Sequence, residues 1–176
     1  QDDFVKILAG VQESHGGTIE ILDIKEKFSK YSSLEDAKKN GISFVSGDRK
    51  KEGILPNLSI YENLVVPLYK KTSKAGFLGF IDWMELNGIF DWEVERLNIK
   101  TGPRDNLIGS LSGGNQQKVM IARSFAQHPK VLILNDPARG IDISTKRDLY
   151  VHLRKYVEEG NTVVFLSSEL EEFIGL

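Results

Sequence analysis

The chain has 176 residues, a net charge of −2, 40% hydrophobic residues and no cysteine. This length fits one globular domain with a buried core, and these values exclude a disulfide framework, a thiolate metal site and a strongly basic nucleic-acid surface. No apolar run approaches the roughly 20 residues that cross a bilayer, so any membrane association is expected to go through a partner.

The first part of the chain predicts short elements. Residues 1–10 carry apolar side chains whose spacing fits either a strand or a helix. Residues 18–22 predict a short strand. Ser32 and Glu35 resemble a capping box that opens a helix, and this helix is expected to end at Gly41.

A strand and a charged loop are expected next. Residues 42–45 predict a strand, and the polar, glycine-flanked residues 46–53 predict a loop. This loop holds three adjacent cations, Arg49, Lys50 and Lys51. Without interleaved aromatic residues or a positive net charge, these cations indicate a solvated loop rather than a nucleic-acid site.

The central part of the chain predicts two helices. Ser59 and Glu62 resemble a second capping box, whose helix runs to about Val66. Residues 70–81 are expected to be a loop whose aromatic side chains pack on the domain, with a docking surface for a transmembrane partner as the alternative. A longer helix is expected over residues 82–97. Five of its apolar residues are expected to be buried: Trp83, Leu86, Ile89, Phe90 and Trp92.

Residues 111–117, LSGGNQQ, read as a glycine turn that opens directly into a helix. Ser112 is a good N-cap, and Gly113 and Gly114 allow another backbone or a ligand to approach closely. The helix is expected to run through Gln127. Its apolar residues share one side: Val119, Ile121, Ala122, Phe125 and Ala126. A helix start with free amides and a hydroxyl suits phosphate, although an ordinary capped helix fits this stretch equally well by itself.

Strand and helix patterns alternate in the last part of the chain. The apolar run 131–134 predicts a buried strand, with Asn135 and Asp136 at its carboxyl end. A helix is expected from Ser144 to about residue 159, followed by a buried strand over residues 162–166. Four residues of this helix are expected to share its buried face: Leu149, Leu153, Tyr156 and Val157. This alternation predicts an α/β fold with a parallel sheet.

Four ordered segments resemble the second half of an ATP-binding cassette (ABC) ATPase. LSGGNQQ resembles the ABC signature, VLILNDP the Walker B strand, ARGID the D-loop and LSSEL the switch region. Upstream, GISFVSGDRKKEGI is similar to the Q-loop region. NQQ and RGID most resemble the C-terminal cassette of bacterial sugar importers of the ribose, galactose or xylose type, in which two cassettes are fused in one polypeptide.

The resemblance implies the ABC-type P-loop NTPase fold, with residues 1–176 as one partial nucleotide-binding domain and a helical subdomain inserted at residues 54–128. The P-loop pattern G-x-x-x-x-G-K-[ST] does not occur in the sequence. We therefore expect a fragment that begins after its P-loop and lacks the N-terminal strands.

The resemblance also implies roles for four residues of the chain's own nucleotide site. Asn135 stands at the Walker B position that supports Mg²⁺, where an amide lacks the charge that a hard cation favours. Asp136 stands at the water-activating position, with a shorter carboxylate than the family's glutamate. Ser168 occupies the switch position, and Gly47 the usual Q-loop glutamine position. This site is therefore expected to be degraded.

The signature, by contrast, is intact. In this family two cassettes dimerise head to tail, and each signature completes the ATP site of the other. Ser112, Gly113, Gly114 and Gln116 are thus expected to contact nucleotide in trans. The D-loop residues would lie at the dimer seam: Arg139, Gly140 and Asp142.

These roles predict an ATP-binding domain that couples ATP hydrolysis to monosaccharide uptake, with ATP and Mg²⁺ in the full assembly and no activity in the isolated chain. Its partners would be a second cassette and a membrane permease, with no nucleic acid and no direct membrane insertion, so that it is cytoplasmic and peripheral to the cell membrane. The alternatives are a non-catalytic binding module with the ABC fold and a non-transport ABC ATPase. Three histidines lack a second ligand at metal spacing and are interpreted as structural: His15, His128 and His152.

Overall fold

The structure is a computed structural model that describes residues 2–13, 19–20, 27–28, 33–69, 73–74, 80–138 and 141–169. Its centre is a parallel sheet of three strands, β3 (Ile42–Val45), β6 (Val131–Asn135) and β7 (Thr162–Leu166), in the order β3-β6-β7. Ile42 pairs with Val131, and Val131 pairs with Thr162. The predicted parallel α/β sheet is confirmed.

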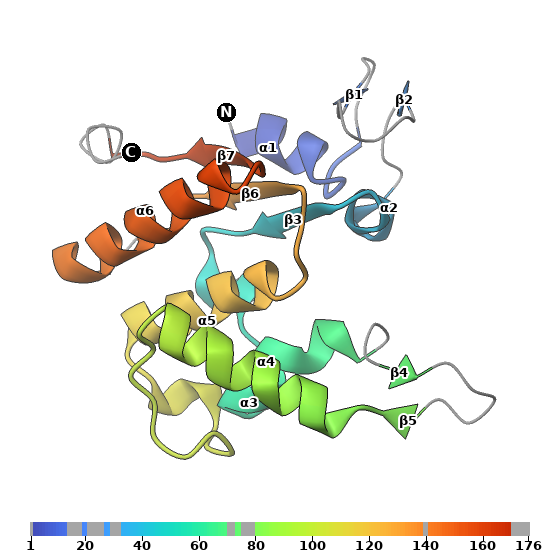
Figure 1. Cartoon of the computed structure of the whole chain (residues 1–176). Coiled ribbons are helices and arrows are strands. Elements are labelled where there is room, and N and C mark those ends of the chain that lie inside the picture. The colour runs from blue at the N-terminus through green and yellow to red at the C-terminus, as the bar shows by residue number, and fades with distance from the viewer. Residues whose placement is uncertain are drawn as a thin grey trace.

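Helices cover both faces of this sheet, which explains why its central strand is a continuous apolar run (Figure 1). Successive side chains of a strand point to opposite faces. Leu132 and Leu134 of β6 accordingly join the larger hydrophobic cluster, whereas Ile133 between them joins a smaller one.

The smaller cluster lies under the N-terminal helices. α1 (Asp2–Leu8) contributes Val5, and α2 (Leu34–Lys39) contributes Ala37. The open choice between strand and helix for residues 1–10 is thus resolved as a helix. The N-cap of α2 is Ser33 and not the predicted Ser32, because the Ser33 hydroxyl accepts a hydrogen bond from the Asp36 amide. Ser32 itself lies outside the described residues.

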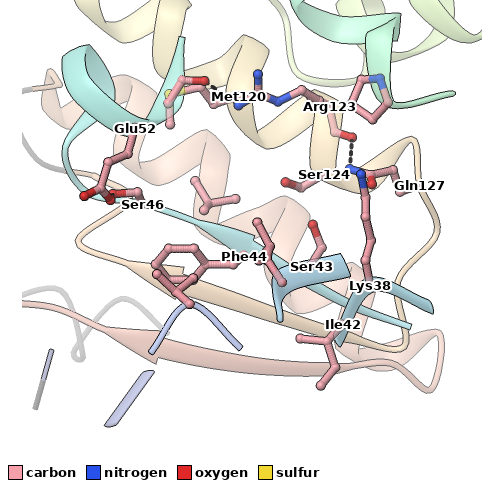
Figure 2. A pocket seen from close by; sticks show the side chains of 15 residues that line it. Lys38, Ile42, Ser43, Phe44, Ser46, Glu52, Met120, Arg123, Ser124 and Gln127 are labelled. Atoms are coloured by element: carbon pink, nitrogen blue, oxygen red, sulfur yellow. Dashed lines mark hydrogen bonds between the residues drawn. The ribbon is translucent and has the colours of Figure 1, made fainter. Parts of the chain in front are cut away.

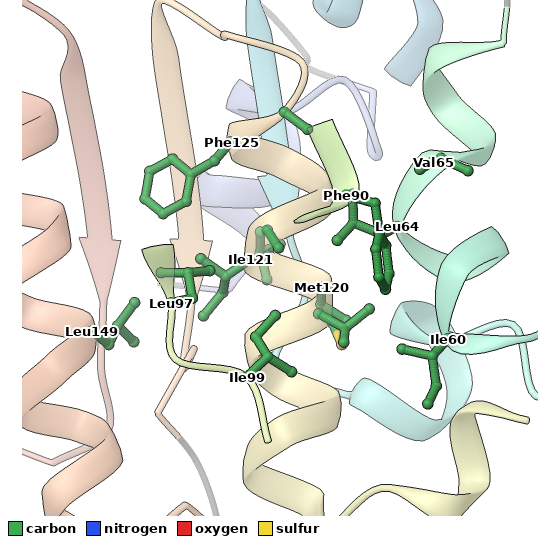
Figure 3. Close-up of a cluster of buried hydrophobic side chains, with 14 of the residues drawn as sticks. Ile60, Leu64, Val65, Phe90, Leu97, Ile99, Met120, Ile121, Phe125 and Leu149 are labelled. Carbon is green, nitrogen blue, oxygen red and sulfur yellow. The ribbon is translucent and has the colours of Figure 1, made fainter. Parts of the chain in front are cut away.

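The larger cluster joins the other face of the sheet to a layer of helices (Figures 1 and 3). These elements are α3 (Ile60–Val65), the short 3₁₀ helix η2 (Val66–Leu68), α4 (Trp83–Arg96), the 3₁₀ helix η3 (Ile108–Ser110), α5 (Gly113–Phe125) and α6 (Ile143–Glu158). α5 is buried on its predicted side and lies between the sheet and α3 and α4. From Gln117 to Phe125, α5 is therefore held by packing on both sides.

The helix starts follow the predicted caps closely. Ser59 and Glu62 form the expected capping box of α3. Asp82 caps α4, where its carboxylate accepts hydrogen bonds from two backbone amides. α6 begins at Ile143 with Asp142 as its N-cap, so the predicted start at Ser144 is one residue late.

Three predictions of burial or loop structure are wrong. Trp83 and Trp92 are 54% and 60% exposed, because one face of α4 is already filled by Leu86 and Phe90. Val157 of α6 is likewise 49% exposed. Within residues 70–81, the predicted loop contains an antiparallel pair of short strands, β4 (Ser73–Lys74) and β5 (Phe80–Ile81).

Two further short elements complete the described fold. β1 (Ile19–Glu20) pairs antiparallel with β2 (Lys27–Phe28), so the strand predicted over 18–22 is present in part, and its other residues lie outside the described part. The charged loop 46–53 contains a π-helical turn, η1 (Arg49–Gly53), capped by Asp48. Within the described ranges, no helix is both long enough and apolar enough to cross a membrane.

Candidate functional site

The carboxyl ends of β3, β6 and β7 meet at one edge of the sheet and border a cavity of about 420 Å³. Gly47 follows β3, Asn135 ends β6, Asp136 comes directly after it, and Ser168 follows β7. The cavity thus brings together all four residues expected in the chain's own nucleotide site. This is also where open α/β sheets commonly bind ligands.

Asp136 is tied to the strand beside it. Its Oδ1 accepts a hydrogen bond from the Ser168 amide at 2.6 Å, and its own amide donates to the Leu166 carbonyl at 2.8 Å. Asp136 also has a φ of 44°, a left-handed backbone conformation that non-glycine residues adopt rarely. One carboxylate oxygen is therefore engaged in holding the switch segment against Walker B.

Gly47 presses directly against the end of β6. A Cβ at this position would lie 2.8 Å from the Asn135 carbonyl oxygen and 3.1 Å from the Asp136 Cβ. Since real Cβ atoms do not approach a backbone oxygen that closely, no side chain fits here without a backbone shift. Packing against β6 therefore excludes a side chain at Gly47, a constraint that the sequence does not show.

The side chains at this edge could supply only a minority of the ligands of a Mg²⁺ ion. Mg²⁺ is usually bound by one or two carboxylates together with phosphates and water. Here the cavity offers the Asp136 carboxylate and the Asn135 amide at the Walker B positions. In the part of the chain that the structure describes, no group of three or more His, Asp or Glu side chains is placed to hold a metal.

The signature forms the start of α5 as predicted. Ser112 is the N-cap, and its exposed hydroxyl accepts hydrogen bonds from the amide and the side-chain nitrogen of Asn115 at 3.4 and 3.1 Å. Asn115 Oδ1 in turn accepts the Lys100 amide at 3.0 Å. The hydroxyl and the first amides of α5 together form a helix start suited to an anion.

The two signature glycines have different neighbours. A Cβ on Gly113 would lie 2.9 Å from Nη2 of Arg49, whereas a Cβ on Gly114 would lie 3.7 Å from Asp142 Oδ2, an ordinary contact. A side chain at Gly113 would thus displace the Arg49 guanidinium, the flexible end of a side chain of the same chain. At Gly114 the chain itself leaves room for a methyl group.

Gln116 turns back toward its own loop. Its Nε2 donates to the Leu111 carbonyl at 3.0 Å, so this side chain supports the residues that precede the helix. The structure therefore shows a local contact for a residue that the sequence assigned to nucleotide.

Asp142 lies beside the signature and caps α6. Oδ1 accepts the Thr145 amide at 3.0 Å and the Ser144 hydroxyl, and Oδ2 accepts the Thr145 hydroxyl at 2.8 Å. These hydrogen bonds, that of Ser144 foremost, hold the pKa of the Asp142 carboxyl below its usual range. Arg139 and Gly140, the other two expected seam residues, lie outside the described residues.

Three residues near these sites were not predicted from the sequence. Arg49 donates from Nη1 to the Gly113 carbonyl at 2.8 Å, so the expectation of a fully solvated cation run is wrong for this residue. Glu52 accepts the Ser46 hydroxyl at 2.6 Å, and Arg123 donates to the Gly53 carbonyl. Arg49 and Arg123 contact backbone carbonyls far away in the chain, and Glu52 contacts a serine six residues before it, a spacing that matches no helix or cap pattern.

Glu52 and Arg123 also border a second, larger cavity of about 500 Å³ between α2, β3 and α5 (Figure 2). Burial lowers the pKa of the Arg123 guanidinium. Ser46 and Glu52 line both cavities, so their hydrogen-bonded pair separates this groove from the sheet-edge cavity.

The histidines agree in part with their structural interpretation. His128 follows the end of α5 with a φ of 50°, and its amide donates to the Phe125 carbonyl. His152 is half-buried in α6, and burial lowers its pKa. His15 lies outside the described residues.

Comparison with known proteins identifies the class. The profile of the ABC transporter family matches residues 4–139, which is most of the chain, so the chain belongs to this family. Two solved ATP-binding cassette structures share the fold. The dimeric post-hydrolysis state of the cassette MJ0796 bound to ADP and Pi has a TM-score of 0.79 at 24% identity and covers 97% of this chain and 71% of that chain. A second dimeric structure of MJ0796 has a TM-score of 0.77 at 22% sequence identity. This match covers 99% of this chain and 72% of that chain.

Sequence relatives are more specific. The chain is 38% identical over 175 residues to the ribose import ATP-binding protein RbsA of Bacillus cereus and 35% identical over 176 residues to that of Lactococcus lactis. Each match covers 99% of this chain and 34% of the relative. The chain therefore spans about a third of the length of these curated relatives.

Proposed function

We propose that this chain is part of the ATP-binding component of a monosaccharide importer, and that it acts mainly by presenting its signature to the ATP site of a second cassette. Residues 54–128 form the helical subdomain of this domain. The importer would bring the chain to the cytoplasmic side of the cell membrane through a permease. The similarity to ribose import ATP-binding proteins supports the sugar class.

One observation carries the proposal: the start of α5 keeps an exposed hydroxyl and its glycines, and it is anchored in place. Ser112 is exposed, and a Cβ placed on Gly114 would lie only in ordinary contact, 3.7 Å from Asp142 Oδ2. Bound ATP and Mg²⁺ supply the phosphoanhydride and the cation that polarises it. This chain contributes Ser112, Gly113 and Gly114 around an anion, with Gln116 supporting the loop. The D-loop residues Arg139, Gly140 and Asp142 are assigned to the seam by their sequence motif.

The chain's own site is weaker. Asn135 lacks the charge of an aspartate, and Gly47 has no side chain to orient water. Asp136 engages one carboxylate oxygen with the Ser168 amide, and the Ser168 hydroxyl does not titrate near neutral pH. Activation of water requires a base within hydrogen-bond reach, so this edge would support hydrolysis poorly.

The second cavity supports a permease as partner. It borders the Q-loop segment through Ser46 and Glu52 and is rimmed by exposed apolar side chains, Val11 and Leu34. A permease segment seated there would contact the same hydrogen-bonded pair that borders the nucleotide cavity.

The second candidate function is a non-catalytic binding module, favoured by the engaged Asp136. ATP hydrolysis by the isolated chain tests the proposal first. We expect phosphate release no faster than the blank; release well above it that disappears in Asp136→Ala would refute the degraded site.

Two further measurements separate the alternatives. Nucleotide binding by this chain together with a second cassette should exceed that of the second cassette alone, whereas a non-catalytic module would add nothing. Co-purification of a permease with the polypeptide as its gene encodes it distinguishes an importer component from a non-transport ABC ATPase.

A further inference from the structure

The Q-loop segment is joined to the signature helix by three contacts. At the start of α5, Arg49 of η1 donates from Nη1 to the Gly113 carbonyl at 2.8 Å. Arg49 and Gly113 are 64 positions apart in the chain, so this contact exists only in the folded domain. It ties the first residue of α5 to a turn of a different segment.

The guanidinium of Arg49 lies flat against the glycine. Nη2, Nη1 and Cζ would all be 2.9–3.2 Å from a Cβ on Gly113, so the glycine leaves the space that the guanidinium fills. Arg49 Nε is buried and has no hydrogen-bond partner among the described residues. A buried donor left unpaired is unfavourable, so the other contacts of this side chain must hold it here.

The same turn is held farther along α5. Arg123, in the last turn of α5, donates to the carbonyl of Gly53, the final residue of η1. Met120 packs onto Gly53 so closely that a Cβ there would overlap its thioether. η1 is therefore fixed to α5 at the first turn, the middle and the last turn of the helix.

η1 also reaches the sheet edge. Glu52 accepts the hydroxyl of Ser46, the residue directly after β3, at 2.6 Å. The Asp48 amide donates to the same hydroxyl at 3.2 Å. One short turn thus contacts both the sheet-edge cavity and the start of the signature helix.

We propose that Arg49 is a positioning residue for the signature: it fixes the start of α5 to η1, so that the Q-loop segment and the signature move as one body. This inference rests on the proposed function, in which the signature acts on the second cassette's ATP site. Arg49 does so through the Gly113 carbonyl and its fit against the glycine, without touching nucleotide.

The physical reason is orientation. Donors aimed at a developing charge act only if their directions are fixed beforehand. A charge-assisted hydrogen bond to the first carbonyl of α5 restricts the tilt of the amides that follow. Without it, the helix start keeps its cap and the Gln116 contact but loses its link to η1, so it samples more directions.

The test compares Arg49→Met with Lys50→Met. Both remove one cation from the same turn, but Lys50 is exposed and, within the described residues, makes no hydrogen bond or ion pair with α5. Hydrogen exchange is measured at the amide of Gln116, which donates to the Ser112 carbonyl at 2.9 Å. We expect Arg49→Met to speed this exchange about tenfold, the size expected for one lost hydrogen bond to a charged group, and Lys50→Met to leave it unchanged.

ATP hydrolysis is then measured in the polypeptide as its gene encodes it, assembled with the second cassette. We expect Arg49→Met to lower kcat about tenfold, Arg49→Lys to recover part of the loss, because an ammonium still reaches the carbonyl, and Lys50→Met to match the parent. Exchange at Leu132–Leu134 of β6 reports whether the fold persists. If Arg49→Met does not fold, the same comparison is made with Arg49→Lys, whose exchange should exceed that of the parent.

Equal exchange at Gln116 in parent and Arg49→Met, or an equal effect of Lys50→Met, would overturn the positioning role. Hydrolysis that stays at the parental rate in Arg49→Met would overturn it as well. If the parent assembly itself does not hydrolyse ATP, the proposed function fails, whereas the exchange at Gln116 still decides the role of Arg49.

Discussion

The sheet edge and the start of α5 both carry polar groups and glycines, yet the two regions use them in opposite ways. At the sheet edge, Asp136 binds the Ser168 amide and Gly47 touches the Asn135 carbonyl. At the start of α5, Ser112 is exposed and its loop is anchored from behind by Gln116. The difference teaches that motif residues alone do not define a working site; they must also be exposed to a ligand.

The largest expected effect tests this comparison at the signature. Ser112→Arg in the full assembly should lower ATP hydrolysis on the order of a hundredfold, since it removes a hydroxyl and places bulk at the helix start. Restoring Asn135→Asp with Asp136→Glu should change the rate far less. Steady-state phosphate release measures both. A larger gain from the restored pair than the loss from Ser112→Arg would reverse the comparison.

The second prediction concerns the packed glycine. Gly47→Gln should lower the free energy of unfolding by about 1–3 kcal/mol, because the added side chain forces the backbone of Asn135 away. Gly109→Gln is the matched control, since a Cβ there meets no atom of the described residues within 4 Å. Urea denaturation measures both variants. A Gly47→Gln protein as stable as its control would contradict this prediction, because the sheet edge would then accommodate the side chain without loss of stability.

The third prediction uses pH to test how α4 supports α5. Glu93 of α4 is buried, and this burial raises its pKa to about 7, although Arg96 at 3.3 Å opposes the shift. Arg96 also lies over the ring of Phe125, the last residue of α5. Because the folded state holds the Glu93 proton more tightly than the unfolded state, this carboxyl costs stability increasingly as pH rises from about 4.5 to 7.

Glu93→Gln should therefore stabilise the protein more at pH 8 than at pH 5, by about 2 kcal/mol. Thermal or urea unfolding at the two pH values gives this difference. A pH-independent effect of the substitution would mean that Glu93 titrates normally in the folded state.

The smallest expected effect comes from one added methyl group, which should change stability and hydrolysis in opposite directions. Gly114→Ala should raise the free energy of unfolding by up to about 1 kcal/mol, since alanine is the better helix residue and the site has room for its methyl group. The same methyl group should reduce hydrolysis in the assembly, because it stands where a phosphate would approach. Higher stability with unchanged hydrolysis would remove Gly114 from the nucleotide contact.

Local patterns predicted most of the regular elements. The capping box of Ser59 and Glu62, the N-cap Ser112 and the apolar run of β6 all depend on neighbouring residues, and each has its expected structure. The exposed Trp83 and Trp92 show the limit, because α4 has more apolar residues than its packed face can accept. Periodicity marks which residues are apolar but not how wide the buried face is.

The candidate site was likewise predictable only in part from the sequence. The motif residues Gly47, Asn135, Asp136 and Ser168 do line one cavity, which their order after three parallel strands made predictable. The contact between Arg49 and Gly113 was not predictable, because it joins a charged side chain to a remote carbonyl. Such a contact depends on three-dimensional approach and leaves no spacing in the sequence.

The packing of Gly47 also has a consequence for any redesign of this edge. A mutation that places a larger residue at position 47 meets the Asn135 carbonyl before it can serve any ligand. Substitution at this position is therefore penalised in folding first, and a side chain here would need a compensating shift in the neighbouring strand. The two changes would have to be introduced together.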